Sequence, residues 1–281
     1  MKKKIIMAVA PILAIAFFLF VIVASLISLD FFGANVTDGY VVDNMQYAQL
    51  YKSVTNKYIN NGEGYVSLER ILYFYLESSN LSFEQIYKDN LDPETKKMKP
   101  ISSVCTLEKY KILSGCKSGN ISSSGQIDDD VRKPFNYPLN IGTGTITSFF
   151  MEQRIVFGKN DVHGAWDIGA GAHTPVYSVC DGTVESVSFT QTQNVTNTNA
   201  GGGNQIKIRC EVDDVTYHVI YAHLYPNSSK VKNGDLVKHW QQIAEVGTTG
   251  YSTGNHLHYQ VERDNTKVDG MSLIDFTNKK Q

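Results

Sequence analysis

Hydrophobic and polar positions divide the chain into three stretches of different character. The first is an uncharged, almost wholly apolar run from Ile5 to Leu29, which follows three consecutive lysines at positions 2–4. A helix needs about 20 predominantly apolar residues to cross a bilayer, so this run predicts a transmembrane helix over residues 5–29. A cleaved signal peptide is the alternative, although its apolar region is normally about 7–15 residues long and ends in a small-residue cleavage site.

The lysines before this run predict its orientation. Positive charges beside a membrane helix favour the cytoplasmic side, so residues 1–4 are expected in the cytoplasm. Residues 30–44 are then a juxtamembrane linker, and all that follows lies outside the cytoplasm. A cleaved signal peptide would export the same residues. We therefore expect a single-pass protein of the cell membrane whose larger part is extracytoplasmic.

The second stretch, residues 45–132, has a helical pattern followed by a polar segment. Apolar residues recur at steps of three and four between positions 47 and 54, which predicts one helix. Apolar positions between 66 and 76 predict a second helix, and Ser82 is expected to cap a short third one. The polar residues 96–132, rich in serine and glycine at their centre, predict a partly flexible link.

The third stretch, residues 133–281, shows short alternating or β-branched runs separated by Gly, Asn and Asp clusters, a pattern typical of an all-β domain. Polar residues 190–203 are expected to form a long exposed loop between two strands. The predicted fold class is a mainly β domain preceded by a transmembrane helix and a small α-helical region. Strands are expected at residues 144–149, 175–179, 182–188, 205–210, 215–223 and 256–262.

Composition narrows the function classes only a little. The formal net charge of −2 is too close to zero for a nucleic-acid binder or a polybasic membrane surface.

Four cysteines fit an exported protein, in which disulfides can persist. We expect the pairs Cys105–Cys116 and Cys180–Cys210, although four cysteines allow three connectivities. Four inert, buried thiols are the alternative.

Four histidines and one aspartate of the third stretch form three short patterns. They are His163 and Asp167 four residues apart, His223 within Tyr-Ala-His-Leu-Tyr, and His256 and His258 on either side of a leucine. Side chains alternate across a strand, so the last two imidazoles are expected side by side on one face, with the leucine directed into the core. A catalytic zinc takes three protein ligands of this kind and keeps a fourth position for water.

In this order, the three patterns resemble the lysostaphin-like (LytM-type) zinc metallopeptidases. The resemblance extends from about Tyr137 to the C-terminus, roughly half of the chain, and includes the glycine-rich segment 247–254. The chain departs from the family at two places. Ala165 stands where members commonly have glycine, and residues 151–161 retain Arg154 but lack a tyrosine that some members carry there.

The resemblance implies a role for each residue of the three patterns. His163, Asp167 and His258 would be the ligands of Zn²⁺. His223 and His256 would flank the attacking water, acting in proton transfer and in stabilising the oxyanion of the tetrahedral intermediate. Which of these two histidines is the base stays open.

The resemblance also implies a fold and a substrate. Residues 133–281 would form a zinc metallopeptidase domain on a compact, mainly antiparallel β-sheet, with loop 190–203 as one wall of the groove that holds the metal. Together with export, it implies an endopeptidase for peptidoglycan stem or cross-bridge peptides on the cell-wall side of the membrane. The remaining histidines are interpreted as structural or surface residues: His173, His218 and His239.

Two further roles compete with or extend this one. A catalytically inactive scaffold, or an activator of another cell-wall hydrolase, is the alternative; family members of that kind usually lack metal ligands, whereas all three are present here. An anchor, a helical region and a peptidase domain also loosely resemble wall-opening enzymes of conjugation or secretion machineries. In that case residues 45–132 would dock a partner.

Overall fold

The part of the chain that the structure describes begins after the predicted membrane segment. The segments expected in the cytoplasm, in the membrane and beside it all lie outside the described residues. Within the described ranges, no helix is both long and apolar enough to cross a membrane. The transmembrane helix over residues 5–29 therefore stays a prediction. The computed structural model describes residues 45–75, 81–110, 133–197 and 200–278.

The three helices that the sequence predicts between residues 45 and 91 are found, as α2, α3 and α4. Ser82 caps α4, because its Oγ accepts a hydrogen bond from the backbone N–H of Gln85 at 3.2 Å. Buried aromatic rings join the helices, with Tyr58 and Tyr87 stacked 4.5 Å apart. The predicted link over residues 96–132 is described only as far as residue 110, where it contains the short helix α5 that the sequence did not predict, and residues 111–132 lie outside the described residues. The helices are α2 (Met45–Asn60), α3 (Leu68–Tyr75), α4 (Phe83–Asn90) and α5 (Ile101–Val104).

An antiparallel sheet of eight strands forms the core of the C-terminal half, which confirms the mainly β fold class. The strand order is β1-β4-β11-β8-β7-β6-β9, with β12 beside β11. Residues Ile206, Ile208 and Cys210 of β7 are buried at every second position, as the period of a strand requires. The strands are β1 (Thr145–Ser148), β4 (Trp166–Gly169), β6 (Gly182–Ser188), β7 (Gln205–Val212), β8 (Val215–Ala222), β9 (Leu236–Val237), β11 (His256–Arg263) and β12 (Thr266–Val268).

Two short ribbons and one 3-10 helix complete the described fold. Sequence reasoning did not predict the β2–β3 hairpin, whose residues are mostly exposed and show no apolar alternation. The segment 189–204 connects β6 to β7, so the predicted long loop is confirmed. The remaining elements are β2 (Gln153–Val156), β3 (Lys159–Val162), β5 (Pro175–Tyr177), β10 (Gln242–Glu245) and η2 (Gly270–Leu273).

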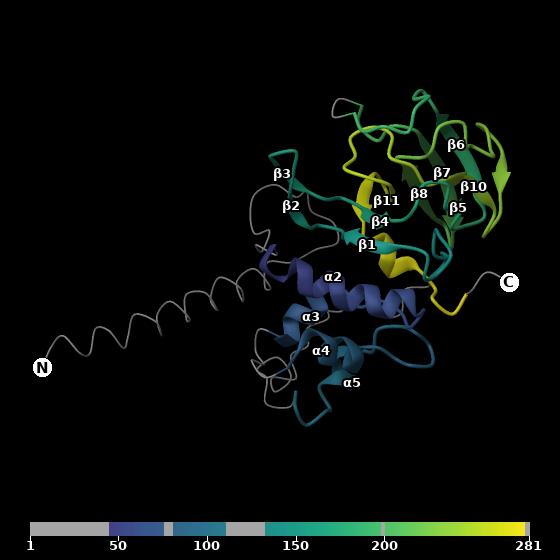
Figure 1. The fold of residues 1–281 in the computed structure, drawn as a ribbon. Helices are drawn as coiled ribbons and strands as arrows, with labels where there is room; N and C mark the ends of the chain where they lie inside the picture. Colours follow the sequence, from purple (N-terminus) through teal and green to yellow (C-terminus); the bar gives the residue numbers. More distant parts are fainter. Residues whose placement is uncertain (1–44, 76–80, 111–132, 198–199, 279–281) are drawn as a thin grey trace, which may run out of the picture.

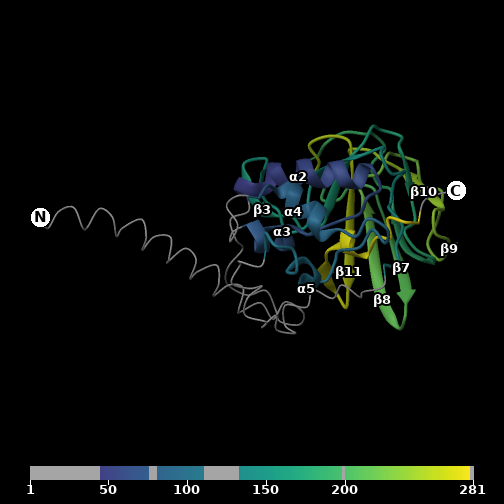
Figure 2. The same ribbon diagram turned by 90° about the horizontal axis from the view of Figure 1, so that it is seen from below.

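Helix α2 lies along β1, the strand at one edge of the sheet (Figure 1). The side-chain amide of Asn56 accepts from the backbone N–H of Ile146 at 2.5 Å and donates to its carbonyl at 3.1 Å. It thereby occupies backbone groups that an edge strand otherwise leaves open to pairing. Figure 2 shows the helices gathered on one side of the molecule, beside the β-rich part. The helical region is thus packed against the sheet.

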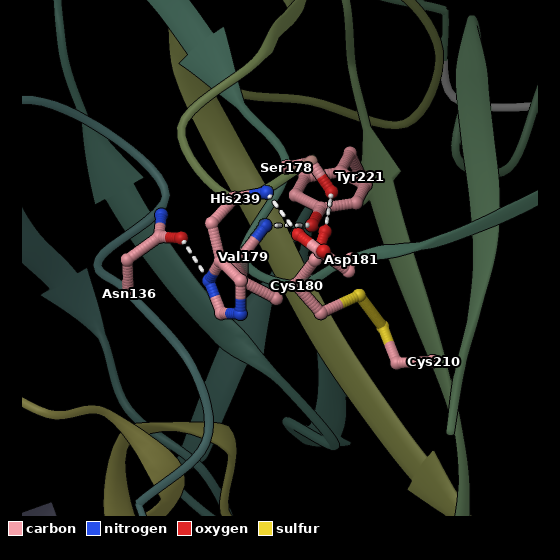
Figure 3. The surroundings of a disulfide bond; sticks show 8 residues. All are labelled: Asn136, Ser178, Val179, Cys180, Asp181, Cys210, Tyr221 and His239. Atoms are coloured by element: carbon pink, nitrogen blue, oxygen red, sulfur yellow. Dashed lines mark hydrogen bonds between the residues drawn. A yellow bond between two sulfur atoms is a disulfide. The ribbon is translucent and has the colours of Figure 1, made fainter. Parts of the chain in front are cut away.

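A disulfide joins the turn just before β6 to β7 (Figure 3). Cys180 and Cys210 are both buried, and their Cα atoms lie 6.1 Å apart. Nearby, the hydroxyl of Tyr221 accepts a hydrogen bond from the backbone N–H of Val179 at 2.9 Å. The predicted pair is therefore confirmed. Cys105 is disulfide-bonded as well, and its expected partner, position 116, lies outside the described residues.

Candidate metal centre and active site

Strands β4 and β11 bring the first and third sequence patterns together. In their antiparallel register Asp167 lies opposite His258, and Gly169 lies opposite His256. Leu257 is fully buried, so the two histidines beside it share the other face, as predicted from strand alternation. His163 enters from the loop just before β4.

Three side chains converge on one point in this region. Nε2 of His163 lies 3.2 Å from Oδ1 of Asp167, and Nδ1 of His258 lies 3.0 Å from the same oxygen. The two nitrogens are 3.3 Å apart. Among the described residues, these three form the group of His, Cys, Asp and Glu side chains that could hold a metal ion.

The spacing and chemistry of this group fit zinc. Ligand atoms about 2.0–2.1 Å from a tetrahedral zinc lie about 3.3 Å from one another, close to the separations found here. Nε2 is the nitrogen of His163 that faces the other two ligands, and its buried Nδ1 has no hydrogen-bond partner. Two imidazoles and one carboxylate are also the donor types that zinc takes in hydrolytic sites.

The charge states of these side chains suit ligands. Burial raises the pKa of Asp167, but hydrogen bonds from His163 and His258 outweigh it and hold this pKa well below its ordinary value. Burial lowers the pKa of His163, more than the Asp167 carboxylate raises it. The aspartate is therefore ionised and His163 neutral near neutral pH, which are the forms that bind a metal.

His223 occupies a strained position at the end of β8. Its φ of 59° lies in the left-handed region, as does the φ of ten other non-glycine residues in the described part of the chain. Its Nδ1 lies 2.7 Å from the carbonyl oxygen of Thr249, and because a carbonyl can only accept, Nδ1 carries the proton. Nε2 is thus left as a proton acceptor. Burial, with the nearby His256 and His258, lowers the pKa of His223 to about 3.

His256 is held in a similar way from the neighbouring strand. Its Nδ1 lies 2.8 Å from the carbonyl oxygen of Gly254, so Nδ1 again carries the proton. Its Nε2 lies 3.5 Å from Oδ1 of Asp167. The rings of His223 and His256 are 4.6 Å apart, so two imidazoles with free Nε2 atoms stand beside the candidate metal ligands.

Two loops meet next to the site. The side chain of Asn194 accepts from the backbone N–H of Thr248 at 2.6 Å, and that of Gln191 accepts from Gly250 at 2.9 Å. These bonds fasten the predicted wall loop to the glycine-rich segment. From the other side, the β2–β3 hairpin reaches the same segment, where Phe157 packs edge-on against Tyr251 at 4.8 Å.

The sequence reasoning missed most of the surroundings of Asp167. Arg154 was noted only for its resemblance to family members, yet its Nη1 donates to Oδ2 of Asp167 at 2.7 Å. Ser148 and Glu152 lie behind it and were not singled out. A buried acidic residue four positions after a serine carries no recognisable signal in one sequence. The other histidines are hydrogen-bonded elsewhere, to the following partners: His173 to Glu245, His218 to Glu185 and His239 to Asn136.

Comparison with known proteins points to one family. Residues 161–270 match the profile of Peptidase family M23. The chain is 32% identical over 169 residues to the peptidoglycan DD-endopeptidase ShyB of Vibrio cholerae, covering 58% of this chain and 36% of that protein. It is 33% identical over 120 residues to the L-Ala–D-Glu endopeptidase of Bacillus subtilis, covering 40% of this chain and 33% of the relative.

The chain is also similar in part to a solved structure. The catalytic domain of the antimicrobial peptidase lysostaphin from Staphylococcus simulans is 26% identical, with a TM-score of 0.39, over 48% of this chain and 93% of that one. The chain spans about a third of the length of the two curated relatives named above. The match of residues 161–270 to Peptidase family M23 confirms the resemblance to lysostaphin-like peptidases for the β-rich part of the chain.

Proposed function

Because residues 161–270 match the profile of Peptidase family M23, we propose that this chain is a zinc-dependent endopeptidase that hydrolyses peptide bonds of peptidoglycan. The observation that carries the proposal is the convergence of His163, Asp167 and His258, with two further imidazoles at its side. Both relatives named above are endopeptidases, and one carries peptidoglycan in its name.

His163, Asp167 and His258 would hold the zinc. When bound, zinc lowers the pKa of water to about 7 and polarises the scissile carbonyl. The chain itself contributes ligands whose charge and position are set by the sheet. Asp167 supplies a negative charge that offsets half of the charge of Zn²⁺, and its position opposite His258 in the sheet keeps both ligands on one rigid surface.

His223 and His256 would carry out proton transfer. Each has its Nδ1–H bound to a backbone carbonyl, which fixes the ring and leaves Nε2 to take a proton from the attacking water. Once protonated, the same N–H would donate to the oxyanion that forms on the substrate carbonyl. General acid–base help of this kind typically contributes about 10²–10⁴ in rate.

The alternative, a catalytically inactive scaffold, fits these residues less well. A scaffold does not need two adjacent histidines that both leave Nε2 free beside the candidate metal ligands. The geometry therefore supports an enzyme.

The cellular setting follows from the predicted export. We propose that residues 5–29 anchor the chain in the cell membrane and place the peptidase on the cell-wall side, within reach of stem or cross-bridge peptides. Service to a conjugation or secretion apparatus would give residues 45–132 a partner. The named relatives differ in the bond that their names specify, so the bond cleaved by this chain has to be measured.

Digestion of purified peptidoglycan tests the proposal. The full chain, with zinc, is incubated with walls that carry different bridge peptides, and the released muropeptides are identified by mass spectrometry. We expect new amino termini from one bridge or stem bond, and none from His223→Ala. A folded, zinc-loaded protein that releases nothing from any wall would favour the scaffold.

A further inference from the structure

Asp167 uses its two oxygens for different tasks. Oδ1 faces His163 and His258, whereas Oδ2 accepts a hydrogen bond from Nη1 of Arg154 at 2.7 Å. Second partners of this kind orient metal-binding carboxylates. Contacts that hold the Arg154 side chain in place therefore also orient the carboxylate of Asp167.

Arg154 is held by acceptors on two sides. Its Nε donates to Oδ2 of Asp161 at 2.9 Å, and its Nη1 also donates to Oγ of Ser148 at 2.8 Å. The Ser148 hydroxyl has one proton, and it lies 2.6 Å from Oε2 of Glu152. An ionised carboxylate can only accept, so Ser148 donates to Glu152 and accepts from Arg154. Both hydrogen bonds therefore run in one direction, from Arg154 through Ser148 to Glu152.

Glu152 is a buried carboxylate, with 4% of its surface exposed. A buried charge is retained only with a compensating partner. That partner comes from the helical region, because Nζ of Lys52 in α2 lies 2.9 Å from Oε1 of Glu152 and also donates to the carbonyl of Thr147 at 3.1 Å. Cation and anion then alternate from α2 to the metal ligand, through Lys52, Glu152, Arg154 and Asp167.

We propose that Lys52 is a positioning residue for the metal ligand Asp167, acting through Glu152, Ser148 and Arg154. The proposal rests on the proposed zinc site and assigns the helical region a part in building it. Without Lys52, the nearest cation available to the buried Glu152 is Arg154, across the shared Ser148 hydroxyl. Arg154 is then drawn toward Glu152 and away from Asp167, and the carboxylate of Asp167 loses the hydrogen bond that orients it.

Zinc affinity of the full chain, measured by competition with a chelator, tests this inference. We expect Lys52→Met to bind zinc about tenfold more weakly, at the lower end of the effect of losing outer partners of a ligand. Other contacts keep α2 in place, such as the edge-on packing of Tyr51 against Phe149 at 5.0 Å. The matched control is Lys57→Met on the same helix, since Lys57 pairs with the exposed Glu84 on α4. It should bind within about twofold of wild type.

A double variant separates positioning from simple loss of stability. In Lys52→Met/Glu152→Gln no uncompensated carboxylate remains to attract Arg154, so zinc affinity should return to within about threefold of wild type. Equal affinities in wild type and Lys52→Met would overturn the inference. So would an equal loss in both lysine variants, or a double variant as weak as Lys52→Met.

These outcomes are distinct from failure of the proposed function. A wild-type chain that binds zinc but releases no muropeptide would contradict the peptidase and leave the Lys52 measurement intact. A wild-type chain that binds no zinc would contradict both. Weakened zinc binding in Lys52→Met, with the predicted recovery in the double variant, would support the positioning role whatever bond is cleaved.

Discussion

Gly203 and Gly201 offer a comparison that tests how the position of His223 is set. Both glycines have positive φ, 61° and 51°. A Cβ on Gly203 would lie 2.4 Å from the backbone C and O of Thr249, whereas a Cβ on Gly201 would have nothing within 4 Å. The carbonyl of Thr249 is the group that fixes the ring of His223. The two alanine variants therefore share the backbone strain and differ in the steric clash.

The magnitude follows from these distances. Ordinary contacts begin near 3.4 Å, so Gly203→Ala requires a shift of about 1 Å between the two backbones. The left-handed conformation costs about 1–2 kcal/mol for alanine, and overpacking adds about 1–3 kcal/mol. At about 2–4 °C per kcal/mol for a domain of this size, we expect the melting temperature to fall by roughly 2–8 °C in Gly201→Ala and by about 4–20 °C in Gly203→Ala.

The effect on activity should be larger than the effect on stability. A misplacement of about 1 Å in a catalytic group can cost about 100-fold in rate. We expect Gly203→Ala to release muropeptides roughly 10–100-fold more slowly while it still binds zinc, because His223 is not among the proposed ligands. The assays are thermal unfolding, zinc content and release rate for both variants. Equal melting temperatures and equal rates in the two variants would refute this reasoning.

Three other predictions follow from single features of the fold. Replacement of Cys180 and Cys210 by serine should lower the free energy of unfolding by about 3–4 kcal/mol, from the entropy of a loop of 30 residues, measured by denaturant titration. Asn56→Ala should cost about 1–3 kcal/mol, because the backbone of Ile146 loses both partners, and thermal unfolding measures it. In zinc-free protein, burial lowers the pKa of His223 to about 3 against about 6.5 when unfolded, so the unfolded state binds the extra proton between these values. Stability should therefore fall as pH drops from about 6.5 toward 3, and this loss should be smaller in His223→Gln, as followed by unfolding at several pH values.

Short-range patterns explain how much of the site could be predicted. The pair His256 and His258 could be assigned to one face because a strand alternates with period two, and the β4–β11 register bears this out. The pairing of Cys180 with Cys210 was predictable for a related reason, since both lie in or next to strands that prove to be neighbours. Local rules of this kind act over a few residues.

The parts that could not be predicted depend on contacts between distant residues. Lys52 and Glu152 are 100 positions apart, and no periodicity links a helix lysine to a turn glutamate. The β2–β3 hairpin shows no apolar alternation, because β3 is exposed on both faces. The positive φ of His223 is also set by its surroundings, through Thr249 and the backbone carbonyl of Gly202, which accepts from the His223 N–H at 2.8 Å.

Zinc content measured together with muropeptide release tests the central claim most directly. Wild type is compared with His258→Ala, which removes a proposed ligand, and His223→Ala, which removes a proposed proton-transfer group. We predict one zinc ion per chain in wild type and in His223→Ala, none in His258→Ala, and muropeptide release by wild type alone. A folded wild type without zinc, or undiminished release by either variant, would contradict the account.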